Sequence, residues 1–407
     1  MTTTGRVDLT DVELFVRGDH HAAFEHLRAT EPIYWNEGAD GAGFWALTTY
    51  ADVVWAYRDH AVFGSERGAI LGGSYRSESD TAGGRMLVAT DLPRHRLLKQ
   101  HIQPAMSPSV AARTAEVVHG LVAKAVARAV ADGGCDFATD IATELPAGAL
   151  MVIMGIGHQD AHRLIELTRS MVGFRDDVFV DTTDDPQLRL AMLQAEIFEF
   201  FAELVDERAA DPSGDDLVSR LLRARVNGRR LSEDEIYYNC MNVAVGGNET
   251  SSYTACTGLL ALIEHPDQYT ALLADPGLTA TAIDEMLRWS STNAYVQRVA
   301  KSTVRRGDVE IRGGDSVTLW NVSANRDEAQ FPAADRFDIT RTPNRHLSYG
   351  SGIHRCVGSP VAESELSVLF GHLGAEGIRF EPAGEPRRLR SNFILGLTRL
   401  PVRVAGR

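Results

Sequence analysis

The segment HLSYGSGIHRCVGS at residues 346–359 holds one cysteine, Cys356, among glycines and two residues after a histidine. A cysteine thiolate can act as a nucleophile or as a metal ligand. The apolar spacing after the cysteine predicts a helix from about 360 to 373, with Pro360 in its first turn. A thiol at the positive end of a helix has a lowered pKa. For a lone cysteine, a buried structural thiol in a glycine-rich turn is the alternative.

Composition narrows the class of protein. The chain has 407 residues and a net charge of −14, which argues against general nucleic-acid binding. Its four cysteines form no CxxC pair, so a disulfide framework or zinc finger is not expected. The polar, acidic amino terminus lacks the pattern of a signal peptide, and no apolar run is long enough to span a membrane. We expect a cytoplasmic protein without a membrane or nucleic-acid partner.

Helical patterns dominate the elements that must position Cys356. Ser232 and Glu235 form a capping box that opens a long helix, which His265-Pro266 should end. The string VEIRGGDSVTLW alternates around Gly313-Gly314, which predicts a hairpin. Other strands cluster near the ends of the chain, and residues 64–90 form a long glycine- and serine-rich loop. The fold class is therefore mainly α with a minor β region, and no linker divides residues 1–407 into two domains.

The string YGSGIHRCVGSPVA resembles the haem-binding signature of the cytochrome P-450 family. This resemblance implies a single-domain, triangular, helix-rich fold and haem b, with Cys356 as the axial ligand of the iron. Tyr349 replaces the usual phenylalanine and keeps an aromatic ring near the sulfur. Val361 and Glu363 also depart from the common leucine and arginine, at helix positions that should affect packing or surface more than ligation.

A second resemblance concerns the family's Glu–Arg–Arg network. Glu285-Met-Leu-Arg288 matches the ExxR pair, whose members share one helix face. Other ExxR strings in the chain are surface pairs by default. Arg336, in NRDEAQFPAADRFDITR, falls at the third position, although Ala334 replaces the usual proline. The resemblance implies a structural network that holds the cysteine loop.

The string VAVGGNETSS at 243–252 resembles the family's oxygen-binding segment. Two glycines in mid-helix otherwise indicate close helix–helix packing. The resemblance implies that Gly246 and Gly247 lie against the haem and O₂. Thr250 would hydrogen-bond the oxygen, and Glu249 would relay protons from solvent. We expect a local widening of the helix at this point.

Haem propionates need buried donors. The string ATDLPRHRLLKQ resembles the family's propionate-binding helix, which implies contacts from His95 and Lys99, with lysine in place of the commoner arginine. Arg298 and His354 match the family's remaining propionate contacts. Each of these residues taken alone is more often a surface charge.

The activity implied is that of a haem-thiolate monooxygenase, which inserts one oxygen atom from O₂ into a C–H bond or an alkene. No flavin or iron–sulfur motif is visible, so electrons from NAD(P)H would arrive through a ferredoxin and a ferredoxin reductase. Arg345 and Arg355 are candidates for ferredoxin contacts. A phenol-coupling or ring-forming oxidase on the same haem is the alternative, with a peroxide-driven enzyme and a non-catalytic haem sensor behind it.

The substrate is expected to be a small secondary metabolite that is polyketide-, terpene- or peptide-like and either free or carrier-bound, and the protein is expected to be a monomer. Residues 64–90, the long helix, the segment after ExxR and the terminal turn NFILGL should form the pocket. The individual candidates are Asn242, Val243, Asn293, Tyr295, Val296, Phe393 and Leu395.

Overall fold

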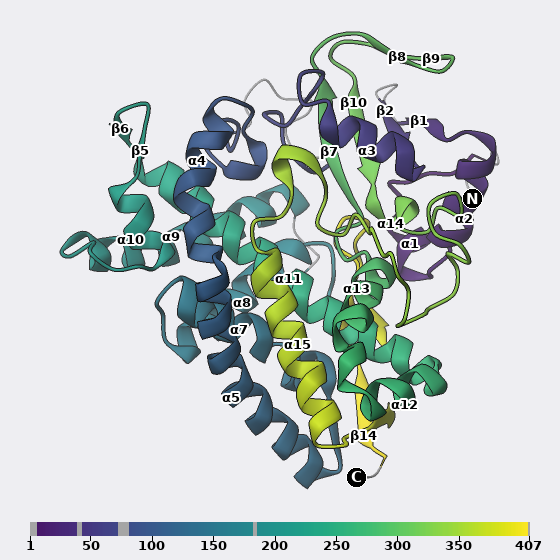
Figure 1. Cartoon of the computed structure of the whole chain (residues 1–407). Helices are drawn as coiled ribbons and strands as arrows, with labels where there is room; N and C mark the ends of the chain where they lie inside the picture. The colour runs from purple at the N-terminus through teal and green to yellow at the C-terminus, as the bar shows by residue number, and fades with distance from the viewer. Residues whose placement is uncertain (1–5, 39–42, 72–80, 182–184, 406–407) are drawn as a thin grey trace.

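A computed structural model describes residues 6–38, 43–71, 81–181 and 185–405. The body is rich in helices, with the main sheet along one side (Figure 1). The helices of the described residues are α1 (Val12–Val16), α2 (His20–Thr30), α3 (Tyr50–Arg58), η2 (Leu87–Ala89), α4 (Arg94–Ile102), η3 (Gln103–Met106), α5 (Pro108–Asp132), α6 (Phe137–Asp140), α7 (Glu144–Ile153), α8 (His158–Val172), α9 (Pro186–Ala209), α10 (Leu217–Arg223), α11 (Glu233–Glu264), α12 (Pro266–Ala274), η4 (Pro276–Leu278), α13 (Thr279–Ser290), α14 (Asn321–Ala324), η5 (Gly352–His354) and α15 (Ser359–Ala375). The predicted mainly helical class is confirmed.

The long helix α11 begins as its sequence predicts. The Ser232 side chain accepts a hydrogen bond from the backbone N–H of Glu235, and the Glu235 carboxylate accepts one from the Ser232 N–H at 2.7 Å. This reciprocal pair satisfies two of the donors that a helix start leaves open. The helix ends at Glu264, and Pro266 starts the next helix.

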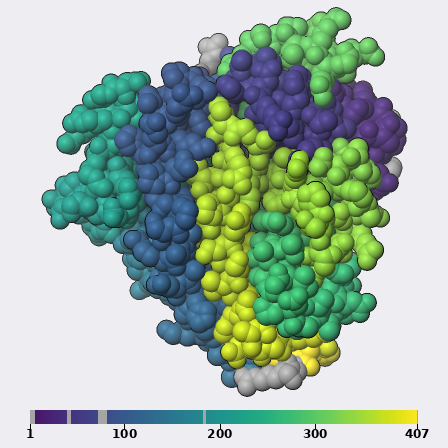
Figure 2. Space-filling view, viewed as in Figure 1, coloured from purple at the N-terminus to yellow at the C-terminus, as the bar shows by residue number. Residues whose placement is uncertain are grey.

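The helices α5, α11 and α15 contribute to the core beneath the cysteine loop. In Figures 1 and 2, α5 and α15 lie side by side on one face, and α11 packs behind α15. Val118 and Val122 of α5, Leu366 and Leu369 of α15 and Leu259 of α11 belong to one buried cluster. Burial of side chains of this size contributes about 1.5–3 kcal/mol each.

The main sheet has the strand order β1-β2-β10-β7-β3, in which only β2 and β10 run parallel. A second sheet has the order β11-β14-β4, and three strand pairs stand apart. The strands are β1 (Ile33–Glu37), β2 (Gly43–Leu47), β3 (Phe63–Gly64), β4 (Gly134–Asp136), β5 (Arg225–Val226), β6 (Arg229–Arg230), β7 (Tyr295–Ala300), β8 (Val304–Arg306), β9 (Val309–Ile311), β10 (Ser316–Trp320), β11 (Phe380–Pro382), β12 (Arg387–Arg388), β13 (Leu397–Arg399) and β14 (Pro401–Val404).

The predicted hairpin around Gly313-Gly314 was wrong. β9 pairs with β8 across a turn at Gly307, whose φ is +57°, whereas β10 leaves this pair and joins β7 and β2. Both sides of β10 are hydrogen-bonded inside the main sheet, so the glycines link two sheets. Local alternation marks both strands, but it does not choose their partners.

No single helix within the described ranges is long and apolar enough to cross a membrane. Phe137–Ile153 and His158–Val172 meet that test only together, and they are bent by 116°.

A buried carboxylate ties α13 to the chain that leads to Cys356. Glu285 and Arg288 are both fully buried, and Arg288 Nη2 lies 2.7 Å from Glu285 Oε1. The Asp338 N–H and the Asn344 side chain also donate to Glu285, at 2.9 and 3.0 Å. A buried ion pair is tolerated when its remaining donors and acceptors are satisfied, as they are here.

The third arginine of this network is Arg341, which corrects the assignment of Arg336. Arg341 Nε lies 3.2 Å from Glu285 Oε2. The Arg336 side chain is exposed, and its backbone carbonyl accepts from both Arg288 and Arg341. The two arginines stand five residues apart in one loop, where no helical or strand period tells which side chain turns inward.

The same helix holds the start of the cysteine loop. Ser348 Oγ donates to the Leu287 carbonyl at 2.6 Å. Asn325 accepts from the Leu347 N–H at 2.6 Å and donates to Ser348 Oγ at 3.0 Å. The segment before Cys356 is therefore fixed to the end of α13.

We predict that Arg341→Ala lowers the free energy of unfolding by about 2–3 kcal/mol, because it removes one partner of a buried carboxylate. Arg336→Ala, the matched control, should change it by less than about 0.5 kcal/mol, since only its backbone takes part. Urea denaturation of both variants measures the difference. Equal effects of the two substitutions would contradict the assignment of Arg341.

Candidate functional site

The cysteine loop closes on itself and lies against α3. The Cys356 N–H donates to the Tyr349 carbonyl at 2.9 Å. Gly350 and Gly352 have φ of +64° and +71°, in the left-handed region that favours glycine. A Cβ on Gly352 would stand 2.5 Å from the carbonyl oxygen of Tyr57, so this position has no room for a side chain.

Burial raises the pKa of the Cys356 thiol, although the side chain remains accessible to water. The backbone N–H groups of Gly358 and Ser359 and the charges of Arg355 and Lys99 act in the opposite direction. The predicted lowering by the helix end was therefore wrong for the free thiol, because desolvation outweighs it. A bound metal ion reverses this balance, since a coordinated thiol is deprotonated outright.

Tyr349, which stands in place of the usual phenylalanine, adds a buried hydroxyl group to the cysteine loop. Its ring is partly buried against the core of α5, α11 and α15, and Arg355 Cζ lies 6.0 Å from the ring centroid. Its hydroxyl is buried and has no hydrogen-bond partner among the described residues. The ring occupies an aromatic position of the loop, whereas the hydroxyl adds an unsatisfied donor.

The middle of α11 presents open backbone. Gly246 and Gly247 are exposed although most neighbouring positions of the helix are buried, and a Cβ on either would meet nothing within 4 Å. Close helix–helix packing therefore does not explain these glycines. Thr250 Oγ1 donates to the Gly246 carbonyl at 2.6 Å. The helix is α-helical throughout this stretch, so the predicted widening was wrong.

Glu249 is fully buried and faces α8. Its Oε1 lies 3.5 Å from Thr168 Oγ1, and its Oε2 lies 3.6 Å from Arg169 Nε. Burial raises the pKa of Glu249, against the opposing effects of the Arg169 charge and of the hydrogen bond from Thr168. Arg169 was not predicted as a site residue, since one arginine on an amphipathic helix has no sequence pattern that marks it as functional.

Four basic side chains converge beside the cysteine loop. The rings of His95 and His354 lie 4.3 Å apart, and Lys99 Nζ donates to the Ile353 carbonyl at 2.9 Å. Burial, with the charges of Lys99 and Arg298, lowers the pKa of His95 to about 4, although Asp91 raises it. Burial and the same basic neighbours lower the pKa of His354 to about 2.

Arg298 is the most deeply buried cation of this group. Its guanidinium donates to the Gln297 carbonyl at 2.6 Å, and it forms no ion pair with any carboxylate of the described chain. Burial lowers its pKa, although Tyr57 and Asp91 raise it. A buried cation without an anion is costly, so this cluster fits the two carboxylates of a haem. With the open face at Gly246–Gly247 and the thiol of Cys356, the residues present fit the whole group.

The candidates for the substrate pocket divide into two groups. An isolated bridge between Asn293 and Ile394 and a hydrogen bond from Ala294 N–H to the Phe393 carbonyl bring two predicted segments together. Tyr295 is a core residue, because it is buried against Trp320 with ring centroids 4.6 Å apart. The partly buried candidates are Asn242, Val243, Asn293, Val296, Phe393 and Leu395.

The predicted 64–90 loop is anchored on both sides of residues 72–80, which lie outside the described residues. The Tyr295 hydroxyl accepts from the Leu71 N–H at 3.1 Å, and Tyr238 donates to Thr81 at 2.7 Å. The loop thereby connects β7 with α11.

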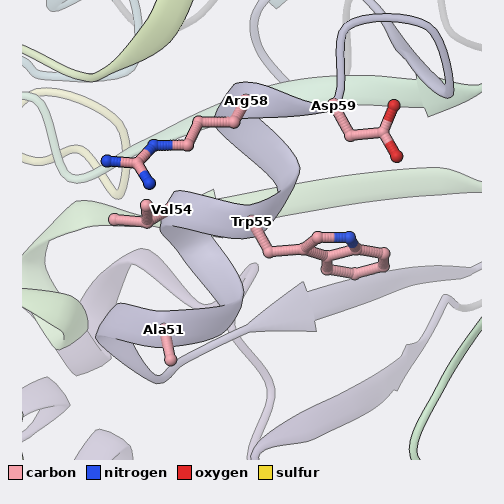
Figure 3. A pocket seen from close by; sticks show the side chains of 5 residues that line it. All are labelled: Ala51, Val54, Trp55, Arg58 and Asp59. Atoms are coloured by element: carbon pink, nitrogen blue, oxygen red, sulfur yellow. The ribbon is translucent and has the colours of Figure 1, made fainter.

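A hollow of about 470 Å³ lies on the surface of α3 and is lined by Ala51, Val54, Trp55, Arg58 and Asp59 (Figure 3). All five residues belong to one helix and the position after it. This hollow is a surface dent that cannot enclose a substrate, and none of the candidate residues lines it.

Another buried acid lies on α15. Glu365 is fully buried, and burial raises its pKa to about 8, although a hydrogen bond with Ser251 of α11 acts against the shift. Its position, nine residues after Cys356, gave no signal of this in the sequence analysis.

Comparison with known proteins identifies the family. The family model described as cytochrome P-450 matches residues 74–373. Linalool 8-monooxygenase of Pseudomonas putida is 33% identical, with 98% of each chain covered. A Mycobacterium marinum cytochrome P-450, solved in complex with pseudoionone, superposes with a TM-score of 0.89 at 29% identity, with 98% of each chain covered. The cytochrome P-450 OxyD, involved in the biosynthesis of vancomycin-type antibiotics, has a TM-score of 0.86 at 34% identity over 98% of this chain and 100% of its own.

We predict that Glu365 makes the folded state less stable as pH rises. Its pKa in the folded state is raised, so its contribution is fully present below pH 4.5 and is lost as pH rises toward about 8. The loss is at most about 1.4 kcal/mol per pH unit. Glu365→Gln should remove this slope in urea denaturation between pH 5 and 8.

Glu376→Gln, at an exposed site at the end of the same helix, is the matched control and should keep the slope. An unchanged pH profile in Glu365→Gln would contradict the burial of a neutral carboxyl group.

Proposed function

The chain belongs to the cytochrome P-450 family, and we propose that it oxidises an acyclic terpenoid by inserting one oxygen atom into a C–H bond or an alkene. As a member of this family it is an oxidoreductase that uses haem b, O₂ and electrons from partner proteins. The observation that carries the proposal is the open glycine face of α11, with a buried acid and a threonine next to it, in a chain that also holds Cys356 in a fixed loop.

Cys356 would ligate the iron, and Tyr349 would lie near the sulfur. His95, Lys99, Arg298 and His354 would hold the propionates, because the cations of Lys99 and Arg298 form no ion pair among the described residues and the two neutral imidazoles can each donate a ring N–H. When bound, the haem supplies the activation of O₂ and the oxidation of the substrate. Gly246 and Gly247 leave the space that this group needs.

Proton supply is the task we assign to Thr250, Glu249 and Arg169. The Thr250 hydroxyl donates to a carbonyl of its own helix, so it can turn to donate elsewhere without leaving a buried partner unpaired. Glu249 has a raised pKa, which favours its holding a proton, and its Oε2 has no hydrogen-bond partner among the described residues. Arg169 lies close enough to stabilise the carboxylate once the proton has left.

The substrate class rests on two relatives that agree in chemistry. One is named for the oxidation of linalool, and the other was solved with pseudoionone. Both molecules are flexible, branched, unsaturated chains with one small polar group. The pocket candidates suit such a chain, since Val243, Val296, Phe393 and Leu395 are apolar and partly buried, with Asn242 and Asn293 as polar exceptions.

A second candidate substrate is a carrier-bound or peptide-like secondary metabolite, which the enzyme would hydroxylate or join by phenol coupling. The involvement of OxyD in the biosynthesis of vancomycin-type antibiotics supports a role in secondary metabolism. A phenol or amino-acid side chain differs from a terpenoid in its rigidity and its hydrogen-bonding groups, so the two classes separate in a binding experiment.

We predict that linalool or pseudoionone shifts the haem spin state of the purified holoenzyme at micromolar concentration. Turnover with a ferredoxin, its reductase and NADPH should give a product heavier by one oxygen atom, labelled from ¹⁸O₂. Tyrosine and a carrier-bound tyrosine are the matched probes for the second candidate. A spin shift with these probes alone would replace the terpenoid assignment.

The surface around the cysteine loop is the docking site we propose for a ferredoxin. Figure 2 shows the yellow-green chain of α15 and its preceding loop reaching the surface between blue α4 and α5 and the purple N-terminal segment. Arg345 and Arg355 are exposed there, on a chain whose net charge is −14. An acidic partner would be steered to this local basic surface.

We propose that the whole chain acts as one catalytic domain, as a monomer in the cytoplasm, where NAD(P)H and the reductase are available.

Arg355→Glu should slow electron transfer from the reduced ferredoxin at least several-fold at low salt. The difference between the variant and the wild type should be smaller at high salt, because salt screens the electrostatic attraction between the two partners. Stopped-flow reduction under carbon monoxide measures the rate. Arg128→Glu, at an exposed site near the far end of α5, is the control with the same change of charge. Equal rates for the two variants would contradict this docking surface.

A further inference from the structure

Three possible metal ligands meet at the corner between α7 and α8. Glu144 is the first residue of α7, His158 is the first residue of α8, and His162 stands one turn later on the same face. The turn between the helices brings the two helix starts together. None of the three residues takes part in the site described above.

The three ligand atoms are close to one another. His158 Nε2 lies 2.8 Å from Glu144 Oε2, and His162 Nε2 lies 3.4 Å from Glu144 Oε1. The two Nε2 atoms lie 3.2 Å apart. The side chains of His158, His162 and Glu144 are 45%, 31% and 16% exposed, so an ion and its water ligands can reach them.

Protons on neutral imidazoles do not satisfy all three contacts. A proton on His158 Nε2 pairs this nitrogen with Glu144, but His158 then offers His162 no lone pair. Without that proton, a nitrogen lone pair faces a carboxylate oxygen at 2.8 Å. One cation between the three atoms would satisfy every contact at once.

The spacing also suits a cation. Two nitrogen ligands of a tetrahedral zinc ion, at roughly 2.0–2.1 Å from the metal, stand about 3.3 Å apart. This value is close to the 3.2 Å between the two histidines. Partial burial raises the pKa of Glu144, but hydrogen bonds with His162 and His158 outweigh it and lower the pKa, so the ligand is ionised at neutral pH.

We propose that Glu144, His158 and His162 bind a divalent first-row transition ion such as Zn²⁺, with water in the open position. The donor set of two imidazoles and one carboxylate is typical of such ions and not of Mg²⁺ or Ca²⁺. The ion joins the starts of α7 and α8. The helix α8 also carries Thr168 and Arg169, so the bound ion would stabilise the helix that contacts Glu249.

Isothermal titration of the haem-loaded holoenzyme, freed of other metal ions by a chelator, with Zn²⁺ at pH 7.5 tests the proposal. We expect one equivalent to bind with micromolar or tighter affinity and to raise the Tm by a few degrees, and Mg²⁺ to do neither. His158→Ala and His162→Ala should each abolish this equivalent, and Glu144→Gln should weaken it at least ten-fold.

His119→Ala is the matched control. His119 and His372 form another histidine pair, with ring centroids 5.7 Å apart, which belongs to no three-ligand cluster among the described residues. This variant should keep the bound equivalent. The haem spectrum of each variant reports its folding. The absence of Zn²⁺ binding, or binding that survives in both His158→Ala and His162→Ala, would overturn the proposal.

Discussion

The burial of one carboxylate constrains the part of the molecule that carries the cysteine. Glu285 has no contact with solvent, so every lone pair it presents needs a donor from the protein. Arg288, Arg341, Asn344 and the Asp338 N–H supply them, and three of these four lie in the chain that leads to Cys356. The chain is irregular here, and this network replaces the backbone ladders that would fix a helix or a strand. The position of the thiol depends on it.

The basic side chains beside the cysteine loop differ from Glu285, because they are buried or partly buried without partners of opposite charge in the part of the chain that the structure describes. Arg298 is as buried as a core residue, yet among the described residues its guanidinium donates only to a backbone carbonyl, and the two histidines beside it have lowered pKa values. Taken alone, the fold would be more stable with apolar residues at these positions. The structure satisfies one buried carboxylate completely but leaves the cations of Arg298 and Lys99 without a carboxylate partner among the described residues, which suits the binding of an anionic group. The open backbone at Gly246 and Gly247 leaves room for this group to be flat and to lie against α11.

The features that the sequence predicted correctly are those marked by short patterns of neighbouring residues. The cysteine loop, the capping box at Ser232 and the ExxR pair each depend on residues close together in the chain, and the structure places them as local rules require. Sequence failed where the partner is distant. Strand alternation did not reveal that β10 leaves β9 for the main sheet, and nothing near Arg341 shows that its side chain, instead of that of Arg336, turns inward. The lowered thiol pKa failed because desolvation depends on the whole surrounding protein.

The central claim is that the sulfur of Cys356 ligates the haem iron. The most direct measurement is the absorption spectrum of the reduced carbon monoxide complex, recorded for the purified holoenzyme and for Cys356→Ala at equal haem content. A thiolate ligand predicts a strongly red-shifted Soret band in the wild type that is absent from the variant. A wild-type band at the position typical of histidine-ligated haem, or a red-shifted band that persists in Cys356→Ala, would contradict the account.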